Sequence, residues 1–473
     1  MEELARYALE KALELGADYV EARSGKGNGE YLLLKNGNAE MVSSSAFRGM
    51  SVRLLYQGGM GFSSVNMPDK ERTLRAVDEA FSMARAASLV TRNNISFAQT
   101  MDHNHVHDRV PKIRFEDIHL ADRLGDVMEL DRTLEKEEGL VSRVINAGMS
   151  QTEKIYINSD GAHIVKRGPA FYMFFTLSVK SGDGNEQAFI QKGELSGWEF
   201  FNHSRFEEEL GKEIKVLQRL NRGEKPPGGV MDVVIGPEVA GIAVHESVGH
   251  PYEADRIMGR EMAQAGGSFV KPDMLGKRIG SECVNVVDDP TIPSLLGHYM
   301  YDDEGTCARP KYLVKNGIIN EFLHNRATAD ALNGVPNGSA RANSYSKEPI
   351  VRMSNTYLAP GDSSLSEMIS QVKNGVFINN FNEWNIDDRR YNQKYVGREA
   401  YLIKNGEIRS PLKRPVLELT TPQLYSSVSL VGGKDEVVMV PGLCGKGDLY
   451  QIIPVTMGGA PALLKNIRLG VVS

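Results

Sequence analysis

The sequence has few cysteines, no surplus of basic residues and no long apolar run, and each shortage excludes a class of protein. The three cysteines are too few and too widely spaced for a disulfide framework. No uncharged apolar run approaches the roughly 18 residues that a membrane-spanning helix needs. The N-terminus is acidic and lacks the basic-then-apolar pattern of a signal peptide. We therefore expect a protein of the reducing cytoplasm with no membrane segment.

The charge balance argues against binding to polyanions. The 61 acidic residues outnumber the 55 lysines and arginines, so the net charge is −6 with neutral histidines. A dedicated nucleic-acid or anionic-membrane binder usually carries a basic surplus. A composition with 41% hydrophobic and 25% charged residues is that of an ordinary globular protein. We expect no direct contact with nucleic acid.

The first half of the chain predicts helices packed on hairpins. Asn36-Gly37 between two apolar runs is a strong hairpin signal, and Gly58-Gly59 predicts a second turn of the same kind. Amphipathic patterns predict helices at the N-terminus, after Pro68-Asp69 and over residues 115–136. A second run of strands is expected between residues 141 and 192, with turns at Asp160-Gly161 and residues 182–184, before a helix that starts near Phe206.

A Pro- and Gly-rich segment, residues 223–229, is the best linker candidate in the chain. We place a domain boundary there. Residues 1–223 are predicted to form an N-terminal α+β domain of antiparallel hairpins with packed helices. Residues 230–473 are predicted to form a strand-rich C-terminal domain that holds the chemistry. Strands and helices come in runs and do not alternate strictly, so the fold class is α+β.

The motif His245-Glu-Ser-Val-Gly-His250 is the clearest chemical signal in the sequence. Two neutral imidazoles bind Zn²⁺ well, and a carboxylate beside the first one, Glu246, can take a proton from an activated water. The spacing is one residue longer than in His-Glu-x-x-His. In a straight α-helix, residues i and i+5 lie about 140° apart, so both rings could not reach one ion.

The flanking residues predict how the chain resolves this misfit. Gly236-Pro237 is a suitable helix start, and the helix is expected to carry His245 and Glu246. Gly249 can adopt unusual backbone angles, and Pro251 disfavours the α region for His250. We therefore expect His250 to leave the helix in a bent or wide final turn.

A catalytic zinc ion usually has three protein ligands, and the sequence leaves the third open. Glu253 and Asp255 are the nearby candidates. Cys444 is the distant one, in Pro441-Gly-Leu-Cys-Gly-Lys-Gly447, where flanking glycines let the backbone approach an ion. Spacing alone does not decide between Cys444 and Glu253. Cys283 and Cys307 are expected to be buried small residues.

The histidine motif with Glu253 and Asp255 resembles the His-Glu-x-x-x-His signature of the TldD/PmbA family of metallopeptidases. The resemblance covers most of the chain, and further matching segments are Gly16–Arg23, the Asn36-Gly37 hairpin, Asp303–Thr306, Asn325–Ala327 and Gly442–Lys446. It implies a zinc ion held by His245, His250 and Cys444, with Glu246 as general base. The family has a TldE branch that lacks the metal motif, and this chain retains the motif of the TldD branch.

The resemblance also implies an activity and partners. It implies hydrolysis of unfolded or extended peptides in the cytoplasm, by a homodimer or by a heterodimer with a TldE-like subunit. Glu253 and Asp255 are then expected to accept ring N–H bonds. No residue is assigned to stabilise the oxyanion, and four are conceivable: Tyr252, His298, His324 and Arg326. The alternative is a non-catalytic regulatory or partner subunit, since members of the family have been called modulators of DNA gyrase.

Three polar clusters are expected to have no chemical role. The acidic turn Asp302–Glu304 and the alternating His103, His105 and His107 are each interpreted as solvated loops. Arg389 and Arg390, with Lys394 and Arg398, are interpreted as a solvated or interface patch.

Overall fold

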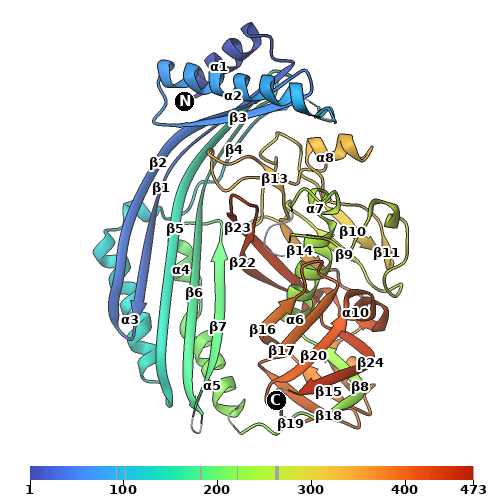
Figure 1. The fold of residues 1–473 in the computed structure, drawn as a ribbon. Helices are drawn as coiled ribbons and strands as arrows, with labels where there is room; N and C mark the ends of the chain where they lie inside the picture. The colour runs from blue at the N-terminus through green and yellow to red at the C-terminus, as the bar shows by residue number, and fades with distance from the viewer. Residues whose placement is uncertain (92, 102, 182–183, 221, 262–265, 472–473) are drawn as a thin grey trace.

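The structure is a computed structural model that describes the chain except residues 92, 102, 182–183, 221, 262–265 and 472–473. Its first 220 residues form one long curved sheet with helices at both ends (Figure 1). The elements are α1 Glu2–Glu14, β1 Tyr19–Lys35, β2 Asn38–Tyr56, β3 Gly59–Asn66, α2 Lys70–Val90, β4 Asn104–Asp108, α3 Leu120–Glu135, β5 Leu140–Asn158, β6 His163–Ser181, β7 Gly184–Glu194, α4 Glu199–His203 and α5 Phe206–Leu220.

This sheet has the strand order β3-β2-β1-β5-β6-β4, and β7 also pairs with β6. All of its pairs are antiparallel except β4 with β6. Its helices cover it in two places: α1 and α2 pack on one end through alanine and valine side chains, and α3 and α5 pack on the other through large apolar ones. The fold class predicted from the sequence, α+β and rich in strands, is confirmed.

The hairpin predictions are correct in kind and differ in detail. The β1–β2 turn is Asn36-Gly37, as predicted, but the two strands run for 17 and 19 residues. The next turn is Gln57-Gly58, one residue earlier than predicted, and both of its residues have positive φ. The turn predicted at residues 182–184 falls largely outside the described residues.

The C-terminal half contains two large sheets that pack around a central helix, and a small antiparallel sheet of β12 and β13. One has the order β11-β10-β9-β14-β23-β22, and the other the order β16-β17-β20-β24-β8-β15-β18-β19, with β21 beside β24. The elements are β8 Gly229–Ile235, α6 Pro237–Val244, α7 Ala254–Ile257, β9 Val286–Asp288, β10 Lys311–Lys315, β11 Ile318–Ile319, α8 Arg326–Ala331, β12 Ala340–Arg341, β13 Ile350–Val351, β14 Asn355–Leu358, α9 Leu365–Ser370, β15 Asn374–Ile378, β16 Phe381–Ile386, β17 Asn392–Gly397, β18 Ala400–Lys404, β19 Glu407–Pro411, β20 Pro415–Thr420, α10 Thr421–Ser427, β21 Val428–Val431, β22 Val438–Lys446, β23 Gln451–Gly459 and β24 Ala462–Val471.

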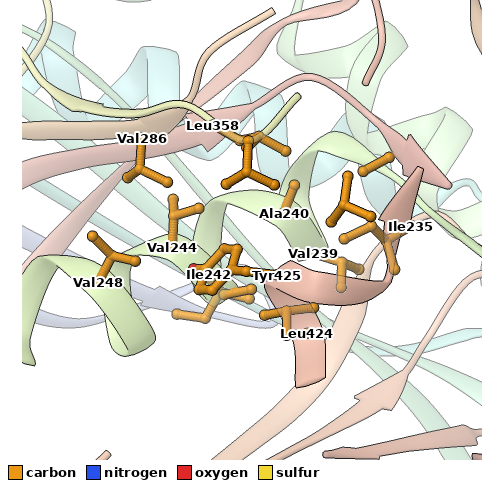
Figure 2. Packing of buried hydrophobic residues seen from close by; sticks show 14 of the residues in the cluster. Ile235, Val239, Ala240, Ile242, Val244, Val248, Val286, Leu358, Leu424 and Tyr425 are labelled. Carbon is orange, nitrogen blue, oxygen red and sulfur yellow. The ribbon is translucent and has the colours of Figure 1, made fainter. Parts of the chain in front are cut away.

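Apart from Glu238 in its first turn, the helix α6 is apolar on every side, which explains its central place. Val239, Ile242 and Val244 are buried with residues of β9, β14 and α10 around them (Figure 2). The predicted linker, residues 223–229, lies between α5 and the start of β8. That the two halves are separate domains stays a prediction. Among the described residues, no helix is both long enough and apolar enough to cross a membrane.

A buried ionic network joins the long sheet to the C-terminal half. Arg53 on β2 forms ion pairs with Glu21 at 2.9 Å and with Glu304 at 2.7 Å. Arg326 donates to the hydroxyl of Tyr19 at 2.7 Å. The expectation of a solvated acidic turn at Asp302–Glu304 is therefore wrong, because Glu304 is fully buried against the guanidinium of Arg53 on β2.

The histidine-rich segment is also not a solvated loop. His103 precedes β4, whose His105 and His107 alternate with exposed residues along the strand. These three rings contact Tyr301 or His298 of the C-terminal half. Among the described residues they do not form a cluster with metal-binding geometry.

Candidate metal centre

The histidine motif lies where α6 changes its winding. The α-helix ends at Val244, a π-helical turn covers His245–Gly249, and a 3-10 turn covers His250–Tyr252. The N–H of His250 donates to the carbonyl of His245, five residues earlier. This wide turn brings residues i and i+5 to one side of the helix, as predicted from the misfit of the spacing. The expectation that Pro251 moves His250 out of the α region is wrong, because His250 has φ −63° and ψ −45°.

Gly249 is needed in this turn for space. Its φ of −49° is open to any residue. A Cβ atom at this position would lie 1.9 Å from Sδ of Met353, which is itself fully buried. The side chain of Met353 therefore packs directly against the backbone of the turn and fixes its position.

Three potential ligands meet beside this turn. One nitrogen of His245, one of His250 and the sulfur of Cys444 all lie within 4.8 Å of one another, and the three residues are buried. The Cys444 Sγ atom is 3.2 Å from His250 Nε2. Usual bond lengths of 2.0–2.1 Å for Zn–N and 2.3 Å for Zn–S imply roughly 3.5 Å between ligand atoms of a tetrahedral site. His245 Nδ1 is buried without a hydrogen-bond partner among the described residues.

Cys444 comes from the edge strand β22, where it pairs with Ile453 of β23. The Arg352 guanidinium donates to its carbonyl at 2.6 Å. Burial raises the pKa of the Cys444 thiol, but His250, Arg352 and His245 outweigh burial, and the pKa lies well below its usual value. The thiolate is the form that ligates metals. Two imidazoles and one thiolate are a donor set compatible with zinc.

The two nearby carboxylates have other partners. Glu253 accepts from His250 Nδ1 at 3.1 Å and from Arg256 Nε at 2.6 Å. Asp255 pairs with Lys446 at 2.7 and 2.8 Å. Glu253 therefore orients the His250 ring from behind, the arrangement that aids a metal-binding histidine. Among the described residues, the hydrogen-bond donors to the Asp255 carboxylate are Arg256, Val351 and Lys446 and not a histidine ring, which differs from the expectation.

Glu246 faces Arg390, a residue that was expected in a solvated or interface patch. Arg390 is buried, and its guanidinium donates to Glu246 Oε2. Burial raises the pKa of Glu246, but Arg390 and the two imidazoles outweigh burial, so the pKa lies below its ordinary value. The interpretation of Arg390 and Arg398 as solvated is wrong, since Arg398 is also buried and pairs with Glu213 at 3.2 Å.

A short turn holds Arg390 in this position. The residue has φ +61°, an unusual value for arginine, and its N–H donates to the carbonyl of Asp387 at 2.9 Å. The Asp387 carboxylate accepts from the backbone N–H groups of three residues in the same turn, Arg389, Tyr391 and Asn392. Arg390 Nε is buried with no hydrogen-bond partner among the described residues. No local sequence signal connects this turn with Glu246, 144 residues earlier.

The cluster opens into a cavity of about 500 Å³. It is lined by His245, Glu246, His250, Cys444 and Arg390, and also by aromatic residues that include Trp384 and Tyr450. A second cavity of about 660 Å³ shares five lining residues with the first, so the two form one cleft between β7, β16 and β22. The four residues considered for the oxyanion, Tyr252, His298, His324 and Arg326, do not line the first cavity.

The other cysteines are outside this cluster. Cys283 is half-buried at the edge of the C-terminal core. Cys307 is exposed, so the expectation that it is a buried residue is wrong.

An α+β fold with a buried His-His-Cys cluster at a cleft defines a candidate metalloenzyme. Family profiles described as PmbA/TldA metallopeptidase domain 1, central domain and C-terminal domain match residues 20–87, 113–218 and 228–470. The chain belongs to the PmbA/TldD metallopeptidase family, and the resemblance read from the sequence is confirmed.

Similar proteins support this assignment over nearly the whole length. A metalloprotease from Methanocaldococcus jannaschii is 31% identical over 95% of this chain and 96% of its own. A zinc metalloprotease TldD homologue from Saccharolobus solfataricus is 25% identical over 98% of both. The crystal structure of TldE from Thermococcus kodakarensis shares the fold, with a TM-score of 0.75, 17% identity and 99% coverage of both chains.

A structure from Bacteroides thetaiotaomicron that carries the provisional name modulator of a DNA gyrase also shares the fold. Its TM-score is 0.76 at 15% identity, and it covers 100% of this chain and 99% of its own.

Proposed function

We propose that this chain is a zinc-dependent peptidase that hydrolyses unfolded or extended peptides. His245, His250 and Cys444 would hold the ion, and Glu246 would be the general base. The observation that carries the proposal is the meeting of these four side chains, from two distant segments, at the inner end of one cleft. The names of the relatives as metalloproteases support it.

The surroundings of Glu246 and Glu253 support a distinct role for each residue in the reaction. When bound, zinc would polarise the scissile carbonyl and make water more acidic. Glu246, whose pKa is below its ordinary value, is ionised at neutral pH and ready to accept the proton of the attacking water. It then returns that proton to the leaving amine. Glu253 fixes the ring of His250 through Nδ1.

Arg390 is the residue that we assign to the oxyanion. It lines the cavity, and its buried Nε–H group has no acceptor among the described residues. An arginine carries five N–H donors, so it can keep its contact with Glu246 and still donate to a substrate oxygen. A positive donor aimed at the developing negative charge stabilises the transition state more than the substrate.

The cleft suits an extended peptide. Its walls include β7, β16 and β22, and among the described residues each of these strands has a partner on one side only. A peptide that adds to such an edge is held through its backbone, with little demand on its side chains. Cys444 lies on β22 itself, so a peptide along this strand passes the metal ligands.

The test combines metal analysis with turnover. Wild-type protein, purified in zinc, should contain one ion per chain and cleave a quenched fluorescent unfolded peptide. His250→Ala and Cys444→Ser should lose the ion. Glu246→Gln should keep the ion and lose turnover, because only the proton acceptor is removed. Zinc content that is unaffected by Cys444→Ser would contradict the ligand set.

The same experiment addresses the regulatory alternative. A wild-type chain that holds zinc but cleaves no peptide, alone or mixed with a TldE-like subunit, would contradict the peptidase proposal. It would favour a role as a non-catalytic partner. The cytoplasmic location also stays a prediction.

A further inference from the structure

Glu238 is a half-buried carboxylate on the wall of the cleft. It lies in the first turn of α6 and lines the cavity of about 660 Å³. Among the described residues, no donor hydrogen-bonds to its side chain, and no lysine, arginine or histidine forms an ion pair with it. A partly buried ionised group without a partner is costly, so this carboxylate is available to a cation from outside the chain.

The cations that line this cavity already have partners. Among the described residues, each lysine and arginine of its lining forms an ion pair with a glutamate: Lys192 with Glu209, Lys212 with Glu208, Arg398 with Glu213 and Arg414 with Glu186. Burial raises the pKa of Glu238, and Arg398, held by Glu213 at 3.2 Å, opposes this only in part. The cavity therefore has an unmatched negative charge, which favours a positively charged ligand.

Glu238 lies on the same face of α6 as the first metal ligand. Residues three and four positions apart are neighbours on a helix, so Glu238, Ile242 and His245 form one row. Ile242 lines both cavities and thus connects the one that holds Glu238 with the one that holds His245. Seven residues of helix rise by about 10 Å, and an extended peptide covers about 3.3 Å per residue. A substrate that passes the metal ligands therefore reaches Glu238 within about three residues.

We propose that Glu238 binds a cationic group of the peptide substrate, within about three residues of the bond that is cut. The proposal rests on the proposed function and names the substrate class: peptides with an ammonium or guanidinium group at one set position. The strands of the cleft then hold the peptide backbone, and Glu238 selects one side chain or terminus. This contact determines which peptide bond lies at the metal ligands.

Two groups of a peptide carry this charge. One is the side chain of lysine or arginine, whose aliphatic stem suits the apolar residues Ile242, Val440 and Met457 of the same cavity. The other is the α-amino group, which would set the distance from the first residue to the bond that is cut. Both groups donate charge-assisted hydrogen bonds to a carboxylate, which are stronger than neutral ones. Acetylation of the peptide removes only the α-amino charge.

Cleavage kinetics measure the preference. The probes are quenched fluorescent peptides, acetylated and uncharged, in which one lysine replaces glutamine at each position in turn. With lysine at one position, wild-type kcat/KM should exceed that of the glutamine peptide by about 10- to 100-fold, as expected for a hydrogen bond between charged groups. Glu238→Gln should remove this preference mainly by raising KM. Glu238→Lys should instead prefer glutamate there. A gain shown only by an unacetylated peptide identifies the α-amino group.

Glu383→Gln is the matched control. Glu383 lines the same cavity but is exposed, so water and salt screen its charge. This variant should keep the lysine preference. An acid in the first turn of a helix also interacts favourably with the helix dipole, so thermal unfolding of Glu238→Gln is measured beside its kinetics. A purely structural role would lower the melting temperature and leave the preference for lysine as in wild type.

Binding without cleavage separates this proposal from the proposed function. In the Glu246→Gln background, fluorescence anisotropy should show that the preferred peptide binds about 10- to 100-fold more tightly than the glutamine peptide, and Glu238→Gln should remove the difference. Equal affinities of the lysine, unacetylated and glutamine peptides would overturn the proposal. A preference that survives Glu238→Gln, or is lost equally in Glu383→Gln, would also overturn it. Binding that depends on Glu238 without cleavage by the wild type contradicts only the peptidase.

Discussion

Arg390 combines an unfavourable backbone conformation with a buried contact to the carboxylate of Glu246. Its φ of +61° is a conformation that arginine rarely adopts, and the turn anchored by Asp387 maintains it. The side chain thereby reaches Glu246 inside the cavity, whereas its neighbour Arg389 is exposed. Arg390 is thus buried in the cavity while the adjacent Arg389 is exposed, so a substitution of Arg389 is a matched control for the same substitution of Arg390.

We predict that Arg390→Gln lowers kcat about 10²- to 10³-fold with little change in KM, the size of effect expected for a lost oxyanion donor. Arg389→Gln should leave both constants unchanged. Zinc content should be equal in the three proteins. The affinity for a phosphinic peptide, which mimics the tetrahedral state, should fall with kcat in Arg390→Gln. An unchanged kcat would contradict the assignment.

At the scale of the element, the π-helical turn is held open by its neighbour. Met353 fills the space above Gly249, so the turn has no room for a side chain. His245 and His250 lie on the same side of the helix only while this turn keeps its wide, π-helical winding. The stability of this turn and the geometry of the candidate metal centre should therefore change together.

We predict that Gly249→Ala lowers the free energy of unfolding by about 1–3 kcal/mol, the usual cost of overpacking a core. It should also weaken zinc binding. Gly125→Ala in α3 is the control, because no atom lies within 4 Å of its added Cβ. That change should raise stability by about 0.5–1 kcal/mol, as expected inside a helix. Urea unfolding and zinc titration measure both effects, and equal behaviour of the two variants would contradict this view.

The elements differ in how far the sequence predicted them. The Asn36-Gly37 hairpin and the wide turn at His245–Gly249 follow from local rules, because turn chemistry and helical spacing act over a few residues. The partners of Glu304 and of Arg390 do not, since the matching charges lie on other elements far away in sequence. A charged run is usually solvated, and only the tertiary fold reveals that these runs are buried. Cys444 was reached by resemblance, and spacing left it undecided.

At the scale of the whole molecule, ionic contacts connect the long sheet with the C-terminal half. Arg53 is buried between Glu21 and Glu304, and the centroid of the Phe97 ring lies 4.6 Å from its guanidinium carbon. Such a network fixes the relative position of two layers because each charge needs its partners in place. The cleft between β7 and β22 depends on this position, since its walls come from both halves.

We predict that Arg53→Met destabilises the protein by about 3–5 kcal/mol, because it leaves two buried carboxylates without their cation. Arg132→Met is the control, since its pair with Glu129 is exposed and worth at most about 1 kcal/mol. Denaturant unfolding compares the two. If Arg53→Met cost no more than Arg132→Met, the network would not hold the halves together.

The stability that the contact between the two halves contributes should also decrease at low pH. Burial, together with Arg109 and Lys166, lowers the pKa of His298 to about 4. An unfolded histidine has a pKa of about 6.5, so the unfolded chain binds the proton first as the pH falls. Stability contributed by neutral His298 is complete above pH 6.5 and is lost as the pH falls towards 4.

We therefore predict that the unfolding free energy in EDTA declines below pH 6.5, with His298 contributing up to about 1.4 kcal/mol per pH unit. His298→Gln should remove this contribution, because the variant lacks the imidazole that takes up the proton on unfolding. Replacement of the exposed His119 by Gln should not change it. Urea unfolding at several pH values between 4.5 and 7.5 measures the slopes, and identical slopes for His298→Gln and wild type would refute the prediction.

The position of Cys444 also has a consequence for biosynthesis. The sulfur joins His250 from 194 residues further along the chain. At a synthesis rate of about 5–20 residues per second, the ribosome needs roughly 10–40 s to get from one to the other. During that interval the nascent polypeptide has both imidazoles but no sulfur beside them. If the chain is the peptidase proposed above, it remains inert until translation is almost finished, and it does not attack nascent chains, its own included, while it is being made.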